Sequence, residues 1–549
     1  MTENASTSQV DEIRAGYAFE GPSLEFGAAV VDGTAHPDAT VRIPLSAMNR
    51  HGLVAGATGT GKTKTLQLMA EQLVAQGVPV FLADIKGDLS GMATPGEPNE
   101  KITARSSDVG MTWQATSYPV EFYALGGQGT GIPVRASVST FGPTLLSKVL
   151  GLNDTQESSL GLVFHYADTK GLWLDTIADL RAVVQFLTSD EGKADLKDLG
   201  GLSSATAGVI LRELVNFSAQ GADLFFGLPE FDTTDLLRTA PDGRGIASML
   251  ELPGVQDRPQ LFSTFLMWLL ADLFHDLPEV GDLDKPKLVF FFDEAHLLFN
   301  DASKDFLDAI QQTVRLIRSK GVGVFFVTQS PKDVPADVLA QLGNRVQHAL
   351  RAFTPDDAKA LKAAARTYPN TAYDLEELLT QLGTGEAVIT VLSEKGAPTP
   401  VAWTRMRAPE SLMAPSPDAL LTQTVAASPI AARYLTAIER ESASEMLGKA
   451  SAARTEAEQA ALVEAENAKV RAAAAAAAEK ARLAAEKQAA KDAAAAQKAQ
   501  ETVERKQAAQ PGVVESVVKS SAFKSALRSA GTVLGREITR SIFGTSRRR

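Results

Sequence analysis

Cysteine is absent from the 549 residues of this chain, and its six histidines are scattered along the sequence. Without cysteine there can be no disulfide, no zinc site built on thiolates and no cysteine nucleophile. The histidines show none of the close spacings that metal ligands need. The chemistry of this protein must therefore rest on other side chains.

Long hydrophobic runs are also missing. The longest apolar stretch, residues 261–274, is interrupted by Ser263, Thr264 and Asp272 and is shorter than the roughly 20 residues that cross a bilayer. The N-terminus lacks the basic start and the apolar segment of a secretory signal. We therefore expect no transmembrane segment and a cytoplasmic location.

Basic residues are outnumbered by acidic ones. The chain has 54 lysine and arginine residues against 66 aspartate and glutamate residues, so its formal net charge is −12. This balance argues against a protein that coats nucleic acid with its whole surface, although it leaves room for a local basic channel. Residues 511–549 reverse the trend, since Glu515 and Glu537 are their only acidic residues among many lysines and arginines. The tail is a basic island on an acidic protein.

A glycine-rich sequence is present at residues 56–63. It reads Gly-Ala-Thr-Gly-Thr-Gly-Lys-Thr and lies between a predicted strand at 52–55 and a predicted helix at 62–75. An apolar strand at 78–84 follows. The order strand, loop, helix, strand opens a parallel α/β sheet, and the loop is a complete P-loop.

The P-loop binds phosphate because its glycines let several backbone N–H groups point inward and the following helix adds its positive dipole. Lys62 is expected to reach the β- and γ-phosphates of a nucleotide, and the Thr63 hydroxyl to ligate Mg²⁺. We therefore expect ATP and Mg²⁺ as cofactors, with the metal brought by the nucleotide. The predicted nucleotide-binding residues are Gly56, Ala57, Thr58, Gly59, Thr60, Gly61, Lys62, Thr63 and Lys64.

Two carboxylates follow the apolar run at 288–292. Asp293 stands at the predicted strand end, where it would hold the magnesium shell, and Glu294 comes next, where it would orient or deprotonate the attacking water. An acidic pair that only caps a helix is the simpler alternative. Gln329 closes a third predicted strand at 323–329, and it either reports the state of the γ-phosphate or positions a loop through a hydrogen bond.

Hydrolysis in such sites commonly needs a cation from a neighbouring subunit. The candidates before and after the strand that ends at Gln329 are Arg315, Arg318, Arg345 and Arg351. Asp84, at the end of the strand 78–84, lies near the phosphates in a sheet of this kind. It either supports the metal or fixes the turn that follows, and the sequence leaves both roles open.

The remaining segments differ in composition. Residues 439–510 are rich in Ala, Lys, Glu, Gln and Arg and poor in Leu, Ile and Val, which favours a solvated helix or a partly disordered spacer over a coiled coil. The predicted fold is α/β, a RecA-like P-loop ATPase core with a mostly parallel sheet, a helical insertion and a long Ala-rich C-terminal helix. The expected parts are a short β-rich lead-in (1–44), the first part of the core (45–94), a mostly helical insertion (95–254), the second part of the core (255–416), a helical or disordered extension (417–510) and a basic amphipathic tail (511–549).

The residues 293–296, Asp-Glu-Ala-His, spell the box of a large helicase superfamily, but those helicases need a second RecA-like domain, which the chain after Pro417 does not provide. The stretches 45–88 and 281–329 instead resemble the HerA-like ATPases, and among them the bacterial YjgR type. The likeness rests on the P-loop, on Ala-Asp-Ile-Lys-Gly-Asp at 83–88 and on Phe-Phe-Asp-Glu-Ala-His at 291–296. His296 is then expected to pack beside the site.

Relatives in the HerA and FtsK group form hexameric rings that pull duplex DNA through a central pore, so the resemblance implies a homo-hexamer and DNA as a partner. It also implies an arginine finger from a Gly-Arg-Lys motif, which residues 317–323 match only in part, with Arg318 as the finger. HerA proteins carry an N-terminal β-barrel that docks on nucleases. About fifty residues before the P-loop are too few for it, so the nuclease partnership is not implied.

These features predict a ring-forming motor that hydrolyses Mg-ATP and acts on DNA, with Lys62, Glu294, Arg318 and Gln329 as catalytic residues. The alternative is an ATPase that acts on a protein client or serves as a membrane-surface scaffold. The tail at 511–549 would then be its docking element, because apolar residues recur there at near-helical spacing among lysines and arginines. Such a helix can meet anionic lipid, nucleic acid or the protein's own ring.

Overall fold

The computed structural model describes residues 2–197, 199–252, 259–281, 283–299 and 304–508. The chain divides into two units, 1–451 and 452–549. The basic tail predicted at 511–549 lies outside the described residues.

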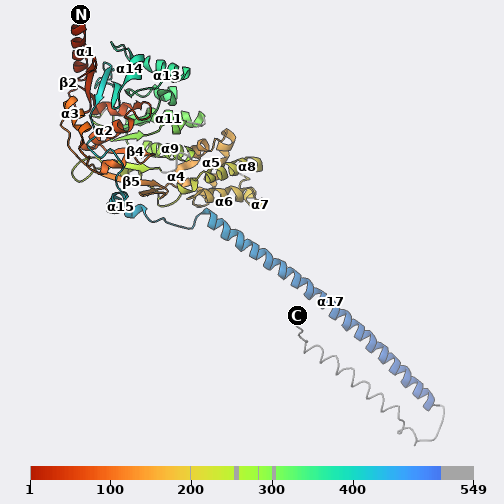
Figure 1. The fold of residues 1–549 in the computed structure, drawn as a ribbon. Helices are drawn as coiled ribbons and strands as arrows, with labels where there is room; N and C mark the ends of the chain where they lie inside the picture. The colour runs from red at the N-terminus through yellow and green to blue at the C-terminus, as the bar shows by residue number, and fades with distance from the viewer. Residues whose placement is uncertain (1, 198, 253–258, 282, 300–303, 509–549) are drawn as a thin grey trace. The chain divides into compact units, whose positions relative to one another are not determined.

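A sheet of 12 strands organises the first unit (Figure 1). In chain order the strands are β1 (Ser23–Val31), β2 (Thr34–Pro44), β3 (Gly52–Ala55), β4 (Val80–Asp84), β5 (Val120–Leu125), β6 (Ile132–Val134), β7 (Ala247–Glu251), β8 (Leu288–Phe292), β9 (Val322–Thr328), β10 (Asn344–Gln347), β11 (Glu386–Thr390) and β12 (Ala402–Met406). Their order across the sheet is β2-β1-β12-β11-β10-β3-β9-β8-β4-β7-β5-β6. The strands from β10 to β6 run parallel, whereas β11, β12, β1 and β2 pair antiparallel. The predicted α/β fold with a mostly parallel sheet is confirmed.

Parallel neighbours need crossover connections, and helices supply most of them. The helices are α1 (Thr2–Gly16), α2 (Lys62–Ala75), α3 (Glu100–Asp108), α4 (Val138–Val149), α5 (Asp154–Thr169), α6 (Ile177–Leu187), α7 (Asp190–Asp195), α8 (Ser204–Ala219), α9 (Pro259–Asp276), α10 (His296–Phe299), α11 (Lys304–Ile317), α12 (Ala336–Leu339), α13 (Pro355–Ala365), α14 (Leu375–Gln381), α15 (Asp418–Ala427), α16 (Ala431–Tyr434) and α17 (Ala443–Gln507). Thus α2 connects β3 to β4, and α11 lies between β8 and β9.

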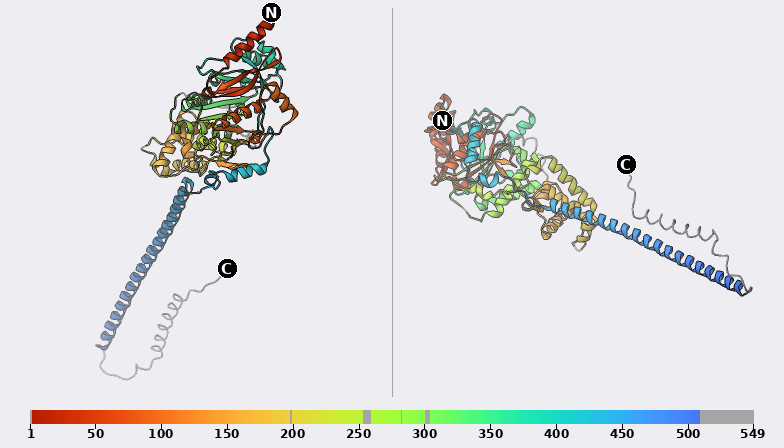
Figure 2. Two further views of the ribbon diagram at one scale, coloured as in Figure 1. Left: turned by 90° about the vertical axis from the view of Figure 1, so that its left-hand side faces the viewer. Right: turned by 90° about the horizontal axis from the view of Figure 1, so that it is seen from below.

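Alternate residues of the central strands face two separate hydrophobic layers. Phe290 of β8 packs in a layer with Phe265 of α9, whereas its neighbour Phe291 packs in the opposite layer with Leu66 and Met69 of α2. This period of two is the geometry of a strand that is buried on both faces. In the left view of Figure 2 the red N-terminal strands lie towards one end of the sheet and the yellow helices of the middle region towards the other.

The predicted helical insertion at 95–254 needs a correction, because it also contains sheet strands. Helices α4 to α8 do cluster there (Figure 1), but β5, β6 and β7 from the same range extend the parallel sheet beyond β4. These strands were not predicted from the sequence because they are short and are bounded by segments with Gly and Pro, which are typical of loops. The middle region is therefore part of the core sheet as well as a helical layer over it.

Two further boundaries differ from the prediction. The lead-in is β-rich from Ser23 onward but begins with α1, whose Val10 and Ile13 pack in the same hydrophobic layer as α2. At the other end, residues 418–451 belong to the first unit rather than to the extension. Arg440 forms an ion pair with Asp175, which joins this segment to the middle region.

The apolar stretch at 261–274 and the Ala-rich segment have contrasting environments. The first lies in α9, and its Leu and Phe side chains other than Phe274 are buried in the layer that covers the sheet. Among the described helices, none combines the length and the apolar character that crossing a bilayer requires. The second unit contains the main length of α17, where the described side chains from 452 to 506 are exposed. This continuous helix agrees with the solvated helix expected from its composition.

Candidate nucleotide site

The P-loop connects β3 to α2, as predicted. Gly59 has φ of 78° and Gly61 has φ of 114°, values in the left-handed region that favours glycine. The amide N–H of Ala57 donates to the carbonyl of Ala349, at 2.8 Å, and so ties the loop to the chain that leaves β10. The loop is therefore shaped by its glycines and anchored to the edge of the sheet.

Donors within the P-loop fit a chain of phosphates. The amide N–H groups of Thr58, Gly59 and Gly61 have no acceptor within the described part of the chain. The Nζ of Lys62 donates to the carbonyl of Ala57, at 3.2 Å, and partial burial lowers the pKa of this lysine. Unpaired N–H groups around a lysine at a helix N-terminus form a cradle that an anion would complete.

Asp293 follows the last residue of β8 and is 3% exposed. Its Oδ1 accepts the amide N–H of Glu294, at 2.9 Å. Burial, and after it the Glu294 charge, raises the pKa of Asp293 to about 6. A cation beside this carboxylate would favour its ionised form, which is the form that ligates a metal.

Glu294 has an unusual backbone and a cationic partner. Its φ is 48°, in the left-handed region, and its side chain is mostly buried. One carboxylate oxygen forms an ion pair with the Nζ of Lys86, and the other lies 3.3 Å from the Nδ1 of His296. Burial opposes ionisation, but the contacts with Lys86, His296 and Gln329 together outweigh it, so the pKa of Glu294 is lowered. Its carboxylate engages Lys86 instead of a helix backbone, and His296 contacts it rather than only packing nearby.

Asp84 fixes the turn that presents Lys86. Its Oδ1 accepts the amide N–H groups of Lys86 and Gly87, at 3.1 and 2.8 Å, and its Oδ2 accepts that of Leu89, at 2.8 Å. Of the two roles that the sequence left open, these contacts favour the turn. The buried carboxylate thereby holds Lys86 beside Glu294.

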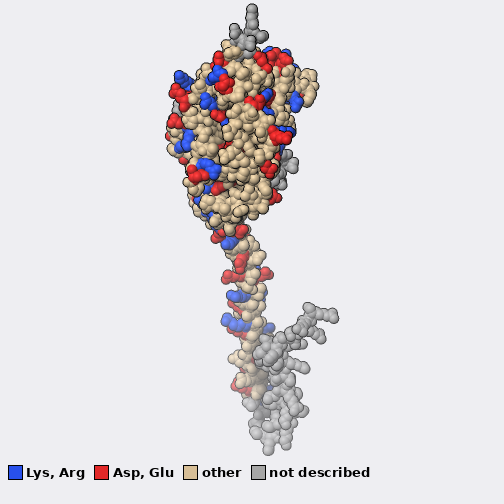
Figure 3. All heavy atoms as spheres, turned by 60° about the vertical axis from the view of Figure 1, so that its left-hand side comes forward, with Lys and Arg blue, Asp and Glu red and all other residues tan. Residues whose placement is uncertain are grey.

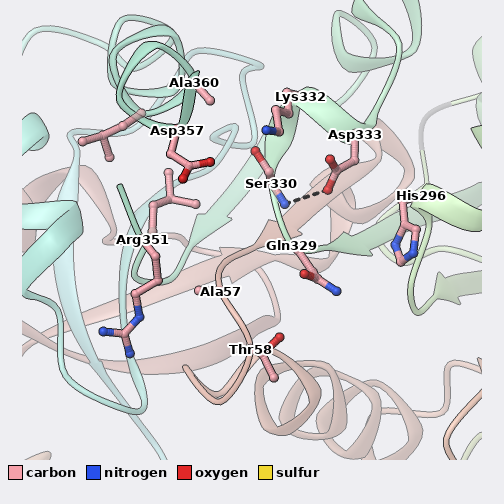
Figure 4. Close-up of a pocket in the computed structure, with 12 residues that line it drawn as sticks. Ala57, Thr58, His296, Gln329, Ser330, Lys332, Asp333, Arg351, Asp357 and Ala360 are labelled. Atoms are coloured by element: carbon pink, nitrogen blue, oxygen red, sulfur yellow. Dashed lines mark hydrogen bonds between the residues drawn. The ribbon is translucent and has the colours of Figure 1, made fainter. Parts of the chain in front are cut away.

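Gln329 immediately follows β9, beside a cavity of about 500 Å³ (Figure 4). Gln329 and Thr58 of the P-loop both line this cavity, and Figure 4 labels both. Asp333 holds the loop after Gln329 through the hydroxyl of Thr328, at 2.8 Å, and the amide of Ser330, at 2.9 Å. Because Asp333 already fixes this loop, the Gln329 side chain is not needed for that role, and it contacts Glu294 instead.

The four candidate arginines lie in different places. Arg318 precedes β9 at its amino end, and Arg315 is in the last turn of α11, whereas Gln329 lies at the carboxyl end of β9. The strand is 7 residues long, so it separates Arg318 from Gln329 by roughly 20 Å. Arg345 lies within β10, and Arg351 lines the cavity. The structure therefore does not bring Arg318 to the P-loop of its own chain.

The sequence reasoning missed two contacts at this site. It quoted Lys86 as part of the motif at 83–88 without giving it a role, and it placed His296 beside the site without a partner. The signal for Lys86 was its position two residues after the buried strand β4, which neighbours β8. Which residue contacts the side chain at a strand end depends on the order of the strands in the sheet. A single sequence does not reveal that order.

Solved structures with a similar course of the chain include plasmid coupling protein TrwB in complex with ADP and Mg²⁺. It is 16% identical, and the match covers 72% of this chain and 99% of that one with a TM-score of 0.45. VirB4 of Thermoanaerobacter pseudethanolicus is 14% identical, with 71% and 97% covered and a TM-score of 0.45.

Curated relatives include the DNA double-strand break repair helicase HerA of Sulfurisphaera tokodaii, which is 24% identical over 361 residues. The same protein of Sulfolobus acidocaldarius is 21% identical over 355 residues. Each match covers 64% of this chain and 64% of the relative, so the chain spans slightly under two thirds of their length. The helicase HerA-like C-terminal family matches residues 30–549, which is nearly the whole chain. The chain belongs to this family of P-loop ATPases.

Proposed function

We propose that this protein is a ring-forming motor that hydrolyses Mg-ATP and moves duplex DNA. The observation that supports hydrolysis is that the carboxyl ends of three strands lie side by side. The P-loop after β3, Gln329 after β9 and Glu294 after β8 lie at the same edge of the sheet, because these three strands are parallel neighbours. A phosphate cradle and a buried carboxylate at one edge are the parts that a hydrolase needs and that a passive nucleotide binder does not.

The residues present also fit a magnesium ion that comes with the nucleotide. Asp293 and the hydroxyl of Thr63 would hold it, and the phosphates would supply further oxygens. Within the described residues no three His, Asp or Glu side chains form a group that could bind a metal alone. When bound, the ion would neutralise charge on the β- and γ-phosphates. Glu294 would orient the attacking water, and Lys62 would hold the phosphates.

The positions of the candidate fingers support an oligomer. Arg318 lies at the amino edge of the sheet, and the P-loop lies at the carboxyl edge, so a single chain cannot bring them together. In a head-to-tail ring, one face of each subunit meets the opposite face of the next. Arg318 could then reach the nucleotide of a neighbour, and the ring would be a hexamer as in the HerA and FtsK group.

The proposal that the motor moves DNA is based on the family, because the curated relatives are named as DNA repair helicases. The net charge of −12 requires the DNA contact to be local. On the face of the first unit drawn in Figure 3, acidic and basic side chains are interspersed rather than gathered in a broad basic surface. A contact confined to the pore of a ring would satisfy both observations.

The test is ATP turnover of the full-length protein with and without duplex DNA, at two salt concentrations. A DNA motor should hydrolyse ATP several-fold faster with DNA. The DNA concentration for half-maximal stimulation should rise steeply with salt, because phosphate contacts release counterions. Turnover that no nucleic acid stimulates would contradict the DNA motor and favour a protein client or a membrane scaffold.

A further inference from the structure

Lys86 is a cation in the candidate site. The roles proposed for the P-loop and for the acidic pair do not involve it. It leaves β4 in the turn that Asp84 fixes, so its backbone position is well defined. Its side chain is 42% exposed, whereas the side chain of its partner Glu294 is 8% exposed. One member of the ion pair is therefore buried and fixed, and the other can move into solvent.

The ion pair occupies the carboxylate that hydrolysis would need. One oxygen of Glu294 is taken by Lys86, and the other is buried without a hydrogen-bond partner beside His296. A carboxylate oxygen must orient or deprotonate the water that attacks the γ-phosphate, and an ion pair makes both oxygens weaker bases. As long as the ion pair persists, Lys86 competes with that water for Glu294.

A nucleotide would offer Lys86 a second partner. Lys86 lies within electrostatic range of Lys62 and of Asp293, which mark the expected positions of the phosphates and the metal. The γ-phosphate brings more negative charge than one carboxylate, and a lysine on a flexible stem can follow it. ADP lacks this group, so it would leave the ion pair in place.

We propose that Lys86 is a γ-phosphate ligand that leaves Glu294 when ATP binds and returns to it when phosphate departs. In the nucleotide-free protein it neutralises Glu294 and occupies one of its oxygens, and with ATP bound it contacts the phosphate and frees that oxygen. This inference rests on the proposed ATPase function. Lys86 would thus make the ability of Glu294 to act as a base depend on the presence of the γ-phosphate.

The experiment compares equilibrium binding of fluorescent AMP-PNP and ADP, each with Mg²⁺, to four full-length proteins: wild type, Lys86→Met, Glu294→Gln and the double variant. Lys86→Met should weaken AMP-PNP binding at least fivefold and ADP binding less than twofold. Glu294→Gln should strengthen AMP-PNP binding, because it releases Lys86 from its ion pair. The double variant should lose that gain.

Lys285→Met is the matched control, because Lys285 is a solvent-side lysine whose Nζ contacts only the Gln76 carbonyl, at 3.3 Å, among its described partners. It should change neither affinity, and Lys86→Arg should restore part of the AMP-PNP binding. Equal weakening of AMP-PNP and ADP, or no weakening of either, would overturn the role of Lys86 and leave the ATPase proposal intact. Failure of the wild-type protein to bind either nucleotide would overturn both.

Discussion

Glu294 combines a costly backbone conformation with a buried charge. Few non-glycine residues adopt φ near 48°, and such residues persist where the surrounding structure holds them. The following residue, Ala295, donates its amide N–H to the carbonyl of Val327, at 2.8 Å, and this bond bends the chain back towards β9. Glycine or asparagine would satisfy this turn more easily, so the carboxylate is best explained by chemistry.

Glu294→Gln should separate nucleotide binding from hydrolysis. Glutamine keeps the size of the side chain but cannot take a proton from water, so we expect ATP turnover to fall by roughly 100-fold or more while Mg-ATP still binds. Phosphate release and nucleotide binding measure the two properties. The matched control is Glu100→Gln, an exposed position in the first turn of α3. Turnover close to wild type in Glu294→Gln would show that another group positions the water.

His51 should make the stability of the fold sensitive to acid. Its ring is fully buried, and its Nδ1 accepts the amide N–H of Val324, at 3.1 Å. Burial lowers its pKa from 6.5 to about 4. The unfolded chain therefore binds a proton in this range before the folded protein does, and stability falls as the pH drops from about 6.5 to 4.

The loss due to His51 should approach about 3 kcal/mol across that range. The variant His51→Asn removes the titrating ring at a backbone position with φ of 58° and ψ of 169°. Urea unfolding at pH 7, 5.5 and 4.5 should show a smaller acid loss in the variant than in the wild type. Equal losses of stability in the two proteins would mean that folding does not change the pKa of His51.

Most site residues were predictable at this scale, and their contacts were not. The P-loop, Asp293, Glu294 and Gln329 each stand directly after an apolar run, and a strand end has a defined place in a parallel sheet. The ion pair between Lys86 and Glu294 joins two strand ends that are far apart in the sequence. Only the adjacency of β4 and β8 creates it.

At the scale of elements, close packing of the crossover into β7 explains how the middle region enters the core sheet. Gly245 lies just before β7, and its amide N–H donates to the carbonyl of Val74 in α2, at 2.8 Å. A Cβ atom at this position would lie 2.1 Å from the carbonyl oxygen of Val78. The absence of a side chain thus lets β7 lie beside β4.

Gly245→Ala should therefore destabilise the protein by about 1–3 kcal/mol, because backbone atoms cannot yield to the added methyl group. Gly208→Ala is the matched substitution in α8, where the nearest atom is the flexible end of Arg212 at 3.6 Å. It should stabilise by about 0.5–1 kcal/mol, because alanine favours a helix. Thermal unfolding of both variants checks the opposite signs, and equal effects would contradict the packing argument.

The elements differed in how well the sequence predicted them. The strand β3 and the helix α2 have the predicted bounds, and β8 and β9 lie within one residue of the predicted apolar runs. The strand β10 was missed because Asn344, Arg345 and Gln347 make it mostly polar. It is nevertheless held between β3 and β11 by backbone hydrogen bonds, which do not depend on side chains.

At the scale of the whole molecule, the question is whether two copies complete one site. If Arg318 acts on a neighbour's nucleotide, Arg318→Ala and Glu294→Gln should each abolish turnover alone and complement each other when mixed. A site is complete when an Arg318→Ala subunit supplies Glu294 and a Glu294→Gln neighbour supplies Arg318, so random mixing in equal amounts should restore about one quarter of the sites. Phosphate release measures this recovery, with light scattering to confirm mixed oligomers. Mixed oligomers without recovered turnover would show that Arg318 is not a finger in trans, and the same experiment with Arg315→Ala would then test the next candidate.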